Sequence, residues 1–424
     1  MPRLGTIIEQ DRVDRVDWVD WAGWAHLMLF RAMRFPQVAG AMTGSPKPRI
    51  LVLTAGFGEG HNSAAQHLAL ALRAEGAQVR VEDPCLLGAA VPTRVVQAVY
   101  RWITALTPWL WGRMFRSADA MDFTRKQWWM RLPEQAMGRL VADFRPDGIV
   151  STYPLYPYFV ERLVASGAAP RVPSFQVVTD SLVIHGVWRK APTDFWLVTD
   201  RRTRESLIHA GLPPERVVET GFPVHPRFAT LTPIPAGDPL APPRILYFPT
   251  PNRPHVRRTA RALLDAAPGA RLTIVLGRRF RRLYRYARQL KDEYPGQVRL
   301  TGWTRRVPEL LNNHHLVVGK AGGATVHEAL AARCPMIIDH LVPGQEEGNL
   351  ALLRAIDAGL LANTPQRISA AVRELLGDNA SRWREMKHHL ASHARPSAAT
   401  TAADFILSHL ARCQTTPSQL QDSP

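Results

Sequence analysis

The chain has 424 residues, 46% of them hydrophobic, which leaves room for two domains with cores of their own. It has no uncharged apolar run of about eighteen residues and no basic-then-apolar N-terminus, so we expect neither a spanning helix nor a secretory signal. The three cysteines, which lack metal-ligand spacing and indicate a reducing compartment, are Cys85, Cys334 and Cys413. We therefore expect a cytoplasmic protein.

The net charge of +17 favours three kinds of partner, namely acidic substrates, anionic lipid and nucleic acid. No nucleic-acid-binding motif accompanies the arginines. We therefore expect no nucleic acid as a partner, and the positions of the basic residues have to decide between the other two.

Residues 1–45 precede the first predicted strand. Trp18, Trp21 and Trp24 stand among spaced aspartates there, a pattern typical of one amphipathic helix. Its Trp-rich face is suited either to packing on the body of the protein or to lying on a membrane.

Strands alternate with helices from residue 49 onward. The first strand, Arg49–Thr54, leads into a glycine loop that ends at His61, and a helix then runs from about Asn62 to Glu75. Further strands are predicted at 79–82, 148–151, 174–178 and 195–198. This alternation predicts a parallel, doubly wound α/β sheet over residues 46–230.

Residues 86–140 form an insertion between the second and third strands. It mixes basic residues with five tryptophans, which are Trp102, Trp109, Trp111, Trp128 and Trp129. Such a mixture suits a membrane surface, because indole sits at headgroup depth while guanidinium pairs with phosphate. The alternative is that these tryptophans form the core of a helical pair.

A segment with five prolines, residues 231–243, is predicted to be a domain linker. A second strand-helix series follows over 244–395, with strands predicted at 244–248, 272–276, 298–300, 316–318 and 336–338. We expect two doubly wound domains that face each other across a cleft, with ligands at the carboxyl ends of the strands. Residues 396–424 are predicted to be a helix and a disordered tail.

Gly322 and Gly323 follow a buried strand and begin a helix. Backbone N–H groups at a helix N-terminus, reached without Cβ obstruction, form a site for a diphosphate. Glu328, one turn into the helix, is placed to accept both hydroxyls of a ribose. The alternative is a capping box in which Glu328 only bonds back to the backbone of Thr325.

A second polar loop follows the next strand, Met336–Ile338. Gln345, Glu346 and Asn349 stand there between an apolar strand and an apolar helix, and packing gives no reason for them. They would lie where a sugar attached to the diphosphate ends. The two loops together indicate a nucleotide-sugar site.

These motifs, taken together, resemble the monogalactosyldiacylglycerol synthase and processive diacylglycerol glucosyltransferase group of glycosyltransferase family 28. The matching segments are Val317–Ala329, Pro343–Asn349, Gly58–Ala65, Val150–Leu155, Val178–Asp180 and Gly221–Phe228. The resemblance covers roughly residues 48 to 395. It implies the GT-B fold of two Rossmann-like domains. From the cysteines and the Trp/Arg-rich insertion we expect a cytoplasmic protein that is peripheral to the inner face of the cell membrane.

The activity that the resemblance implies is inverting transfer of a hexose from a UDP-sugar to the hydroxyl of diacylglycerol or a similar lipid. The net charge and the insertion add an anionic membrane surface as an expected partner. The residues that match the family's donor site are Gly322, Gly323, Thr325, Glu328, Gln345, Glu346 and Asn349. Gly58 and Gly60 match its acceptor loop. His61 matches the residue near the acceptor hydroxyl, and an imidazole suits a general base near neutral pH. Asp180 is placed to orient that base or the acceptor.

No metal or other cofactor is expected. The chain has no Asp-x-Asp pair, and a helix N-terminus with arginines can neutralise a leaving diphosphate instead.

Two segments depart from the family pattern. Pro249–His255 replaces a glycine-rich loop that borders the donor in the family, which leaves donor choice and activity open. The second segment is unusually basic and, if helical, presents on one face Arg278, Arg281, Arg282, Arg285 and Arg288. This face is suited to anionic lipid or simply to solvent.

Four alternatives stay open or are set aside. A dehydrogenase is disfavoured because the glycines at 56, 58 and 60 do not match Gly-x-Gly-x-x-Gly. A nucleic-acid-binding protein leaves the polar loop unexplained. A sugar-nucleotide epimerase shares the fold, and a degenerate GT-B protein would bind a nucleotide sugar or lipid without turnover. The sequence does not specify which sugar is moved or whether transfer is processive.

Overall fold

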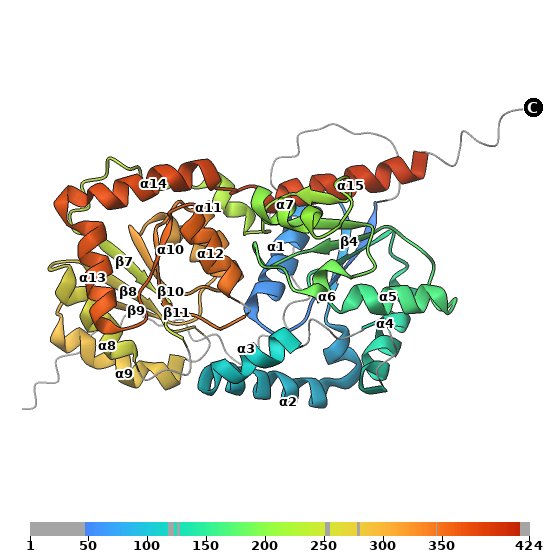
Figure 1. Cartoon of the computed structure of the whole chain (residues 1–424), viewed down its shortest axis with the longest axis horizontal. Helices are drawn as coiled ribbons and strands as arrows, with labels where there is room; N and C mark the ends of the chain where they lie inside the picture. The colour runs from blue at the N-terminus through green and yellow to red at the C-terminus, as the bar shows by residue number, and fades with distance from the viewer. Residues whose placement is uncertain are drawn as a thin grey trace, which may run out of the picture. The chain divides into compact units, whose positions relative to one another are not determined.

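The computed structural model describes residues 47–117, 123–124, 128–250, 255–277, 280–344 and 346–415. The predicted helix within 1–45, the tail beyond 415 and Gln345 lie outside these ranges. Two parallel β-sheets with helices packed on them make up the described part (Figure 1). This confirms the predicted α/β class with two Rossmann-like domains.

The first sheet has six parallel strands in the order β2-β1-β3-β4-β5-β6. Their bounds are β1 Arg49–Leu53, β2 Gln78–Glu82, β3 Gly148–Ser151, β4 Ser174–Val177, β5 Phe195–Val198 and β6 Val217–Glu219. Five were predicted to within a residue at each end. The sixth strand was not predicted, because its three residues are too few to show a pattern.

Helices of the first domain fill the connections between these strands. They are α1 Glu59–Ala74, α2 Pro84–Leu106, α3 Pro108–Ser117, η3 Trp128–Met130, α4 Arg131–Phe144, α5 Tyr156–Ala165, α6 Gly186–Arg189, α7 Arg201–His209 and η4 Pro226–Thr230. The predicted insertion therefore corresponds to α2, α3, η3 and the first part of α4.

The second sheet has the strand order β12-β11-β10-β7-β8-β9. Its strands are β7 Arg244–Tyr247, β8 Arg271–Val275, β9 Val298–Thr301, β10 Leu316–Lys320, β11 Met336–His340 and β12 Gly359–Leu361. Its helices are α8 Val256–Ala266, α9 Phe280–Glu293, α10 Val307–Asn312, α11 Gly323–Ala331, α12 Glu347–Ala355, α13 Pro365–Leu376, η6 Asp378–Ala380 and α14 Ser381–His393. Only β12 was not predicted among these strands.

The proline-rich segment 231–243 packs on the second domain. Ile234 and Leu240 are buried in that domain's core, and the Asp238 carboxylate lies 3.0 Å from the His315 ring. The segment is therefore held in place over its middle part.

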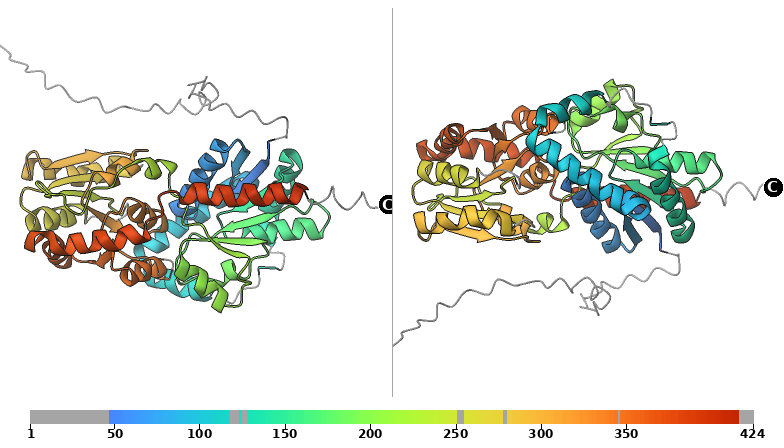
Figure 2. Two further views of the ribbon diagram at one scale, coloured as in Figure 1. Left: turned by 90° about the horizontal axis from the view of Figure 1, so that it is seen from above. Right: turned by 90° about the horizontal axis from the view of Figure 1, so that it is seen from below.

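The last helix, α15 (Ala398–Thr415), belongs to the first domain although it ends the described chain. Its buried side chains Ala402, Ile406 and Leu410 share a core with Ile50 and Val52 of β1. In Figure 1 and in the left view of Figure 2 this helix runs alongside the first sheet. Residues from both ends of the described chain therefore complete one core.

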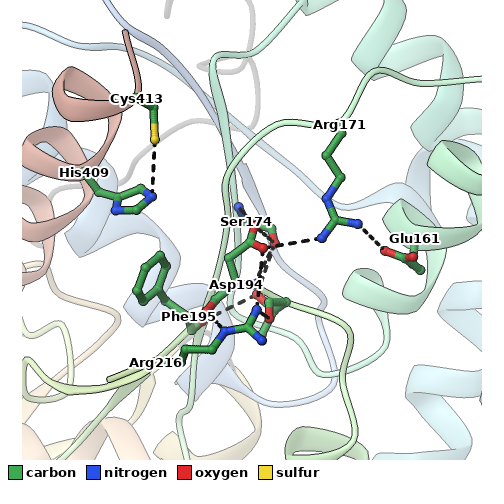
Figure 3. A network of polar contacts seen from close by, with 9 residues as sticks. Glu161, Arg171, Ser174, Asp194, Phe195, Arg216, His409 and Cys413 are labelled. Carbon is green, nitrogen blue, oxygen red and sulfur yellow. Dashed lines mark hydrogen bonds and ion pairs between the residues drawn. The ribbon is translucent and has the colours of Figure 1, made fainter. Parts of the chain in front are cut away.

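A polar network fastens β4 to β5 near α15. The Asp194 carboxylate accepts hydrogen bonds from the Ser174 N–H and hydroxyl, each at 2.8 Å, and forms ion pairs with Arg171 and Arg216 (Figure 3). His409 of α15 stacks edge-on against Phe195, with ring centroids 4.6 Å apart. The network lies at the amino ends of these strands, so it serves the fold and leaves the carboxyl ends to ligands.

Candidate active site

His61 lies in the first turn of α1, directly after the loop that follows β1. Gly58 enters this helix with φ 126°, a conformation that favours glycine. The His61 side chain is buried, and its Nδ1 lies 3.0 Å from the Thr179 hydroxyl. Burial lowers the pKa of His61 to about 4, against a smaller opposing effect of the Thr152 backbone. The imidazole is therefore neutral near pH 7, as a general base requires.

Thr179 helps to orient this ring, as does the hydrogen bond to the Thr152 backbone. If Nδ1 carries the proton and donates it to the Thr179 hydroxyl, the Nε2 lone pair is left to accept a proton from a substrate. Sequence reasoning missed Thr179, although it stands one residue before Asp180 at the carboxyl end of β4. The position after a buried strand was the available signal.

Asp180 has a different partner. Its carboxylate accepts a hydrogen bond from the Trp188 indole N–H at 2.8 Å. Burial raises the pKa of Asp180 to about 6, while the Trp188 bond acts in the opposite direction. The hydrogen bond of Nδ1 of His61 goes to Thr179, so Asp180 does not bond that nitrogen. Its partner Trp188 lies against the His61 ring, with centroids 6.0 Å apart.

The predicted diphosphate turn begins α11. Gly322 is its N-cap residue, and no side chain caps the free N–H groups of the first turn, which also contains Thr325. A Cβ on Gly323 would stand 2.8 Å from the Thr179 carbonyl oxygen, so only glycine fits there. The exposed N–H groups and the positive end of the helix dipole suit a diphosphate.

Glu328 is a half-buried carboxylate on α11 without a hydrogen-bond or ion-pair partner among the residues that the structure describes. Burial raises its pKa to about 8. Because α11 starts at Gly323, Thr325 is not the N-cap residue, and the capping-box alternative is wrong. A partly buried carboxylate without a partner is costly, which favours a ligand with hydroxyl donors.

Lys320 ends β10 beside the diphosphate turn. Its Nζ lies 2.5 Å from Oε1 of Glu346, and it would be 3.1 Å from a Cβ on Gly322. Burial disfavours the charge, but the attraction of Glu346 raises the pKa of Lys320 overall. Sequence reasoning missed this cation, although a lysine at the end of an apolar strand is a recognisable signal. It is well placed to meet a phosphate oxygen.

Glu346 and Asn349, from the predicted sugar loop, bond to neighbouring backbone groups. Glu346 is buried, and its Oε2 accepts a hydrogen bond from the Val342 N–H at 3.0 Å. Asn349 donates to the Ala321 carbonyl at 3.0 Å, while its buried Oδ1 has no partner. Both carboxylate oxygens of Glu346 are thus engaged, and Asn349 keeps one polar atom for a ligand.

The loop after β4 of the first domain contacts the second domain at α11 and at the start of α12. The Ser181 carbonyl oxygen lies so close to Gly348 that a Cβ there would clash, and the Ser181 hydroxyl lies 3.0 Å from Nε2 of His327. His327 in turn stacks on Phe222, with ring centroids 4.9 Å apart. Residues of both domains therefore meet here. Beside them lies a cavity that is lined by Thr199 and Asp200 of the first domain and by His327, Leu330 and Ile356 of the second.

Four of the five insertion tryptophans are largely exposed. They are Trp102, Trp109, Trp128 and Trp129. Trp111 differs, because it packs on Tyr100 with ring centroids 4.8 Å apart and its Nε1 is buried. The alternative of a tryptophan core thus fails for the four exposed residues. No helix among the described residues is long and apolar enough to cross a membrane.

The predicted basic face is partly described. On α9, Arg281, Arg285 and Arg288 are exposed, whereas Leu283 and Leu290 on the other side are buried. The side chain of Arg282, all of Arg278, and residues 251–254 of the replaced loop lie outside the described residues.

One cluster of possible metal ligands occurs among the described residues, formed by Asp357, Glu385 and His389. Arg382 forms ion pairs with both carboxylates. Asp357 also precedes β12 at its amino end, opposite the donor loops. This cluster therefore has no part in the candidate active site.

Comparisons with known proteins show which sequences and structures this chain resembles. Residues 61–224 match the family model for monogalactosyldiacylglycerol (MGDG) synthase. A processive diacylglycerol beta-glucosyltransferase from Bacillus subtilis (strain 168) is 25% identical over 374 residues, which cover 84% of this chain and 94% of that protein.

Two solved structures illustrate the fold. The crystal structure of MurG from Acinetobacter baumannii has a TM-score of 0.54 at 16% identity and covers 86% of this chain and 100% of its own. That of UDP-GlcNAc 2-epimerase from Neisseria meningitidis bound to UDP-GlcNAc has a TM-score of 0.53 at 11% identity, with coverages of 85% and 100%. At these identities the likeness concerns the fold alone.

Proposed function

We propose that this chain, which belongs to the monogalactosyldiacylglycerol synthase and processive diacylglycerol glucosyltransferase group, transfers a hexose from a UDP-sugar to the hydroxyl of diacylglycerol or a related membrane lipid. One observation supports this proposal above the others. Thr179 contacts the His61 ring with its hydroxyl and lies against Gly323 of the diphosphate turn with its carbonyl. A neutral base and an anion site are thus neighbours.

The donor binds to the second domain. Its diphosphate lies at the N-terminus of α11, where the free N–H groups and Lys320 neutralise charge, and its ribose hydroxyls donate to Glu328. Asn349 offers its unpaired Oδ1 to the sugar.

The acceptor hydroxyl lies at Nε2 of His61. As its oxygen bonds to the anomeric carbon, the proton passes to Nε2 and the bond from that carbon to the diphosphate breaks. UDP leaves with the electron pair, and the configuration inverts because attack and departure occur on opposite faces. Lys320 and the α11 N–H groups stabilise the charge that develops on the leaving diphosphate.

We further propose that the protein attaches peripherally to the anionic inner face of the cell membrane. Support comes from the outward side chains of α2, α3 and η3, among them Trp102, Trp109 and Trp128, which lie close in sequence to the exposed Arg94, Arg101 and Arg113. Apolar and aromatic side chains enter the interface while guanidinium groups pair with lipid phosphate.

The test is incubation of the purified chain with diacylglycerol and each common UDP-hexose, followed by mass analysis of the lipid. We expect one hexose to be added from at least one donor. UDP binding without any transfer would identify a degenerate transferase instead, and conversion of the free UDP-sugar to its epimer would identify an epimerase.

A further inference from the structure

Helix α2 exposes several apolar side chains and buries polar ones. Its outward face carries Val91, Val95, Val99 and Trp102, each about half exposed or more. Its inward face carries Thr93 and Gln97, which are both more than nine-tenths buried. A helix in water normally buries its apolar face, so the polar inward face of α2 needs an explanation.

Thr93 is satisfied by the chain itself, because its hydroxyl donates to the Cys85 carbonyl at 2.7 Å. Gln97 is not. Its buried Nε2 has no hydrogen-bond partner among the described residues. This nitrogen lies only 2.6 Å from the position that a Cβ on residue 56 would occupy. Gly56 thus makes room for the Gln97 amide beside the loop that leads to His61.

A row of aromatic rings extends from His61 to α3. It consists of Tyr153, Phe57, Tyr100, Trp111 and Phe115, which are all partly exposed. Successive centroids from His61 are 5.3, 5.6, 6.2, 4.8 and 6.1 Å apart. Apolar ring surface therefore connects the candidate base to the helices with the exposed apolar face.

This aromatic row contains a second donor without a partner. Nε1 of Trp111 is buried and makes no hydrogen bond within the described part of the chain. Trp111 packs on Tyr100, which follows Gln97 by about one turn on α2. Two buried N–H donors thus lie along the same path. Buried donors without acceptors are rare in folded proteins and point to a ligand that supplies the acceptors.

We propose that Gln97 Nε2 and Trp111 Nε1 bind the ester carbonyl oxygens of the acceptor diacylglycerol. Diacylglycerol supplies the missing acceptors, because it has two ester carbonyls for the two donors. Its one hydroxyl is the acceptor hydroxyl at His61, and its acyl chains follow the aromatic row to the apolar face of α2 and α3. This inference rests on the proposed function and makes ester recognition a property of this site.

The experiment compares two acceptors that differ only in the carbonyls, a 1,2-diacylglycerol and the 1,2-dialkylglycerol of equal chain length, in mixed micelles with the active UDP-hexose. The wild type should use the ester at least about tenfold better by kcat/KM, as the loss of one or two hydrogen bonds implies. Gln97→Leu and Trp111→Phe should each raise KM for the ester, leave KM for the ether unchanged, and reduce the preference.

Gln176→Leu is the matched control. Gln176 is another fully buried amide without partners among the described residues, but it lies on β4, which contributes no ring to the aromatic row, so its variant should keep the ester preference. Equal use of both acceptors by the wild type, or an unchanged preference in both variants, would overturn the inference while leaving the proposed function intact.

A wild type without transfer would instead refute the proposed function. In that case, calorimetric titration with dioctanoylglycerol and its dioctyl ether still tests whether Gln97 and Trp111 bind the ester carbonyls. If the wild type binds the ester more tightly than the ether and both variants lose this difference, the assignment of the two donors is supported. Equal binding of ester and ether by the wild type rejects it.

Discussion

The carbonyl oxygen of Thr179 lies 2.8 Å from the position that a Cβ on Gly323 would occupy. The same threonine holds the His61 ring through its hydroxyl. A single residue at the end of β4 therefore contacts both the candidate base and the start of the donor helix, which lie in different domains.

Gly323→Ala is expected to damage donor binding. The added methyl group would press on the Thr179 carbonyl, so either α11 or the β4 loop must shift, and UDP affinity and kcat/KM should fall about tenfold or more. Calorimetric titration with UDP and steady-state kinetics measure the effect. Gly237→Ala is the control, because nothing lies within 4 Å of its Cβ position. Equal behaviour of the two variants would contradict the close approach.

Thr179→Val should lower kcat by about ten- to a hundredfold with little change in KM for the donor, because the ring of His61 loses the hydroxyl that fixes its tautomer. Thr179→Ser keeps a hydroxyl and should recover most of the activity. If the serine variant is as slow as the valine variant, the threonine acts through packing alone.

His61→Ala should lower kcat by about 10²–10⁴ and leave UDP affinity unchanged, since base catalysis acts in the transition state. The pH profile gives an independent check. Because burial depresses the pKa of His61 to about 4, the neutral base persists well below pH 6.5, and wild-type activity should fall only as pH drops through about 4. A fall centred near 6.5 in the free enzyme would show that His61 is not the base or that it is hydrated.

Glu328 should take part in proton release. Its pKa of about 8 means that the carboxyl is mostly protonated at pH 7, and ribose hydroxyls that donate to it favour the ionised form. UDP binding at pH 7 should therefore release up to about one proton, measured by calorimetry in buffers of different ionisation enthalpy. Glu328→Gln should abolish the release, and Glu328→Ala should weaken UDP binding about ten- to a hundredfold. Equal proton release in the Gln variant would assign the proton to another group.

Membrane attachment should depend on the outward tryptophans of the insertion. Replacement of Trp102 and Trp109 by serine should reduce sedimentation with vesicles that contain anionic lipid, and wild-type binding should weaken with salt. Trp303→Ser is the matched control, since Trp303 is 52% exposed but belongs to the second domain. Salt-independent binding to neutral and anionic vesicles alike would exclude the electrostatic part.

The sequence by itself determined the α/β class, ten of the twelve described strands, and the Gly-Gly turn at the head of α11. These features are local, because a buried parallel strand is an apolar run of a few residues and a helix start has its own residue preferences. The two strands that it missed, β6 and β12, have only three residues each. They exist because a neighbouring strand offers hydrogen bonds.

Only the tertiary structure decided which side chains face each other. Thr179, and not Asp180, lies on His61, although 118 residues separate the two in sequence. Glu346 accepts hydrogen bonds from Lys320 at one carboxylate oxygen and from the Val342 N–H at the other, so both oxygens are engaged. Trp111 packs on Tyr100 and buries its Nε1, while the other four tryptophans of the insertion are largely exposed. Each of these outcomes depends on strand order and helix rotation, which follow from non-local pairing and packing that no local pattern encodes.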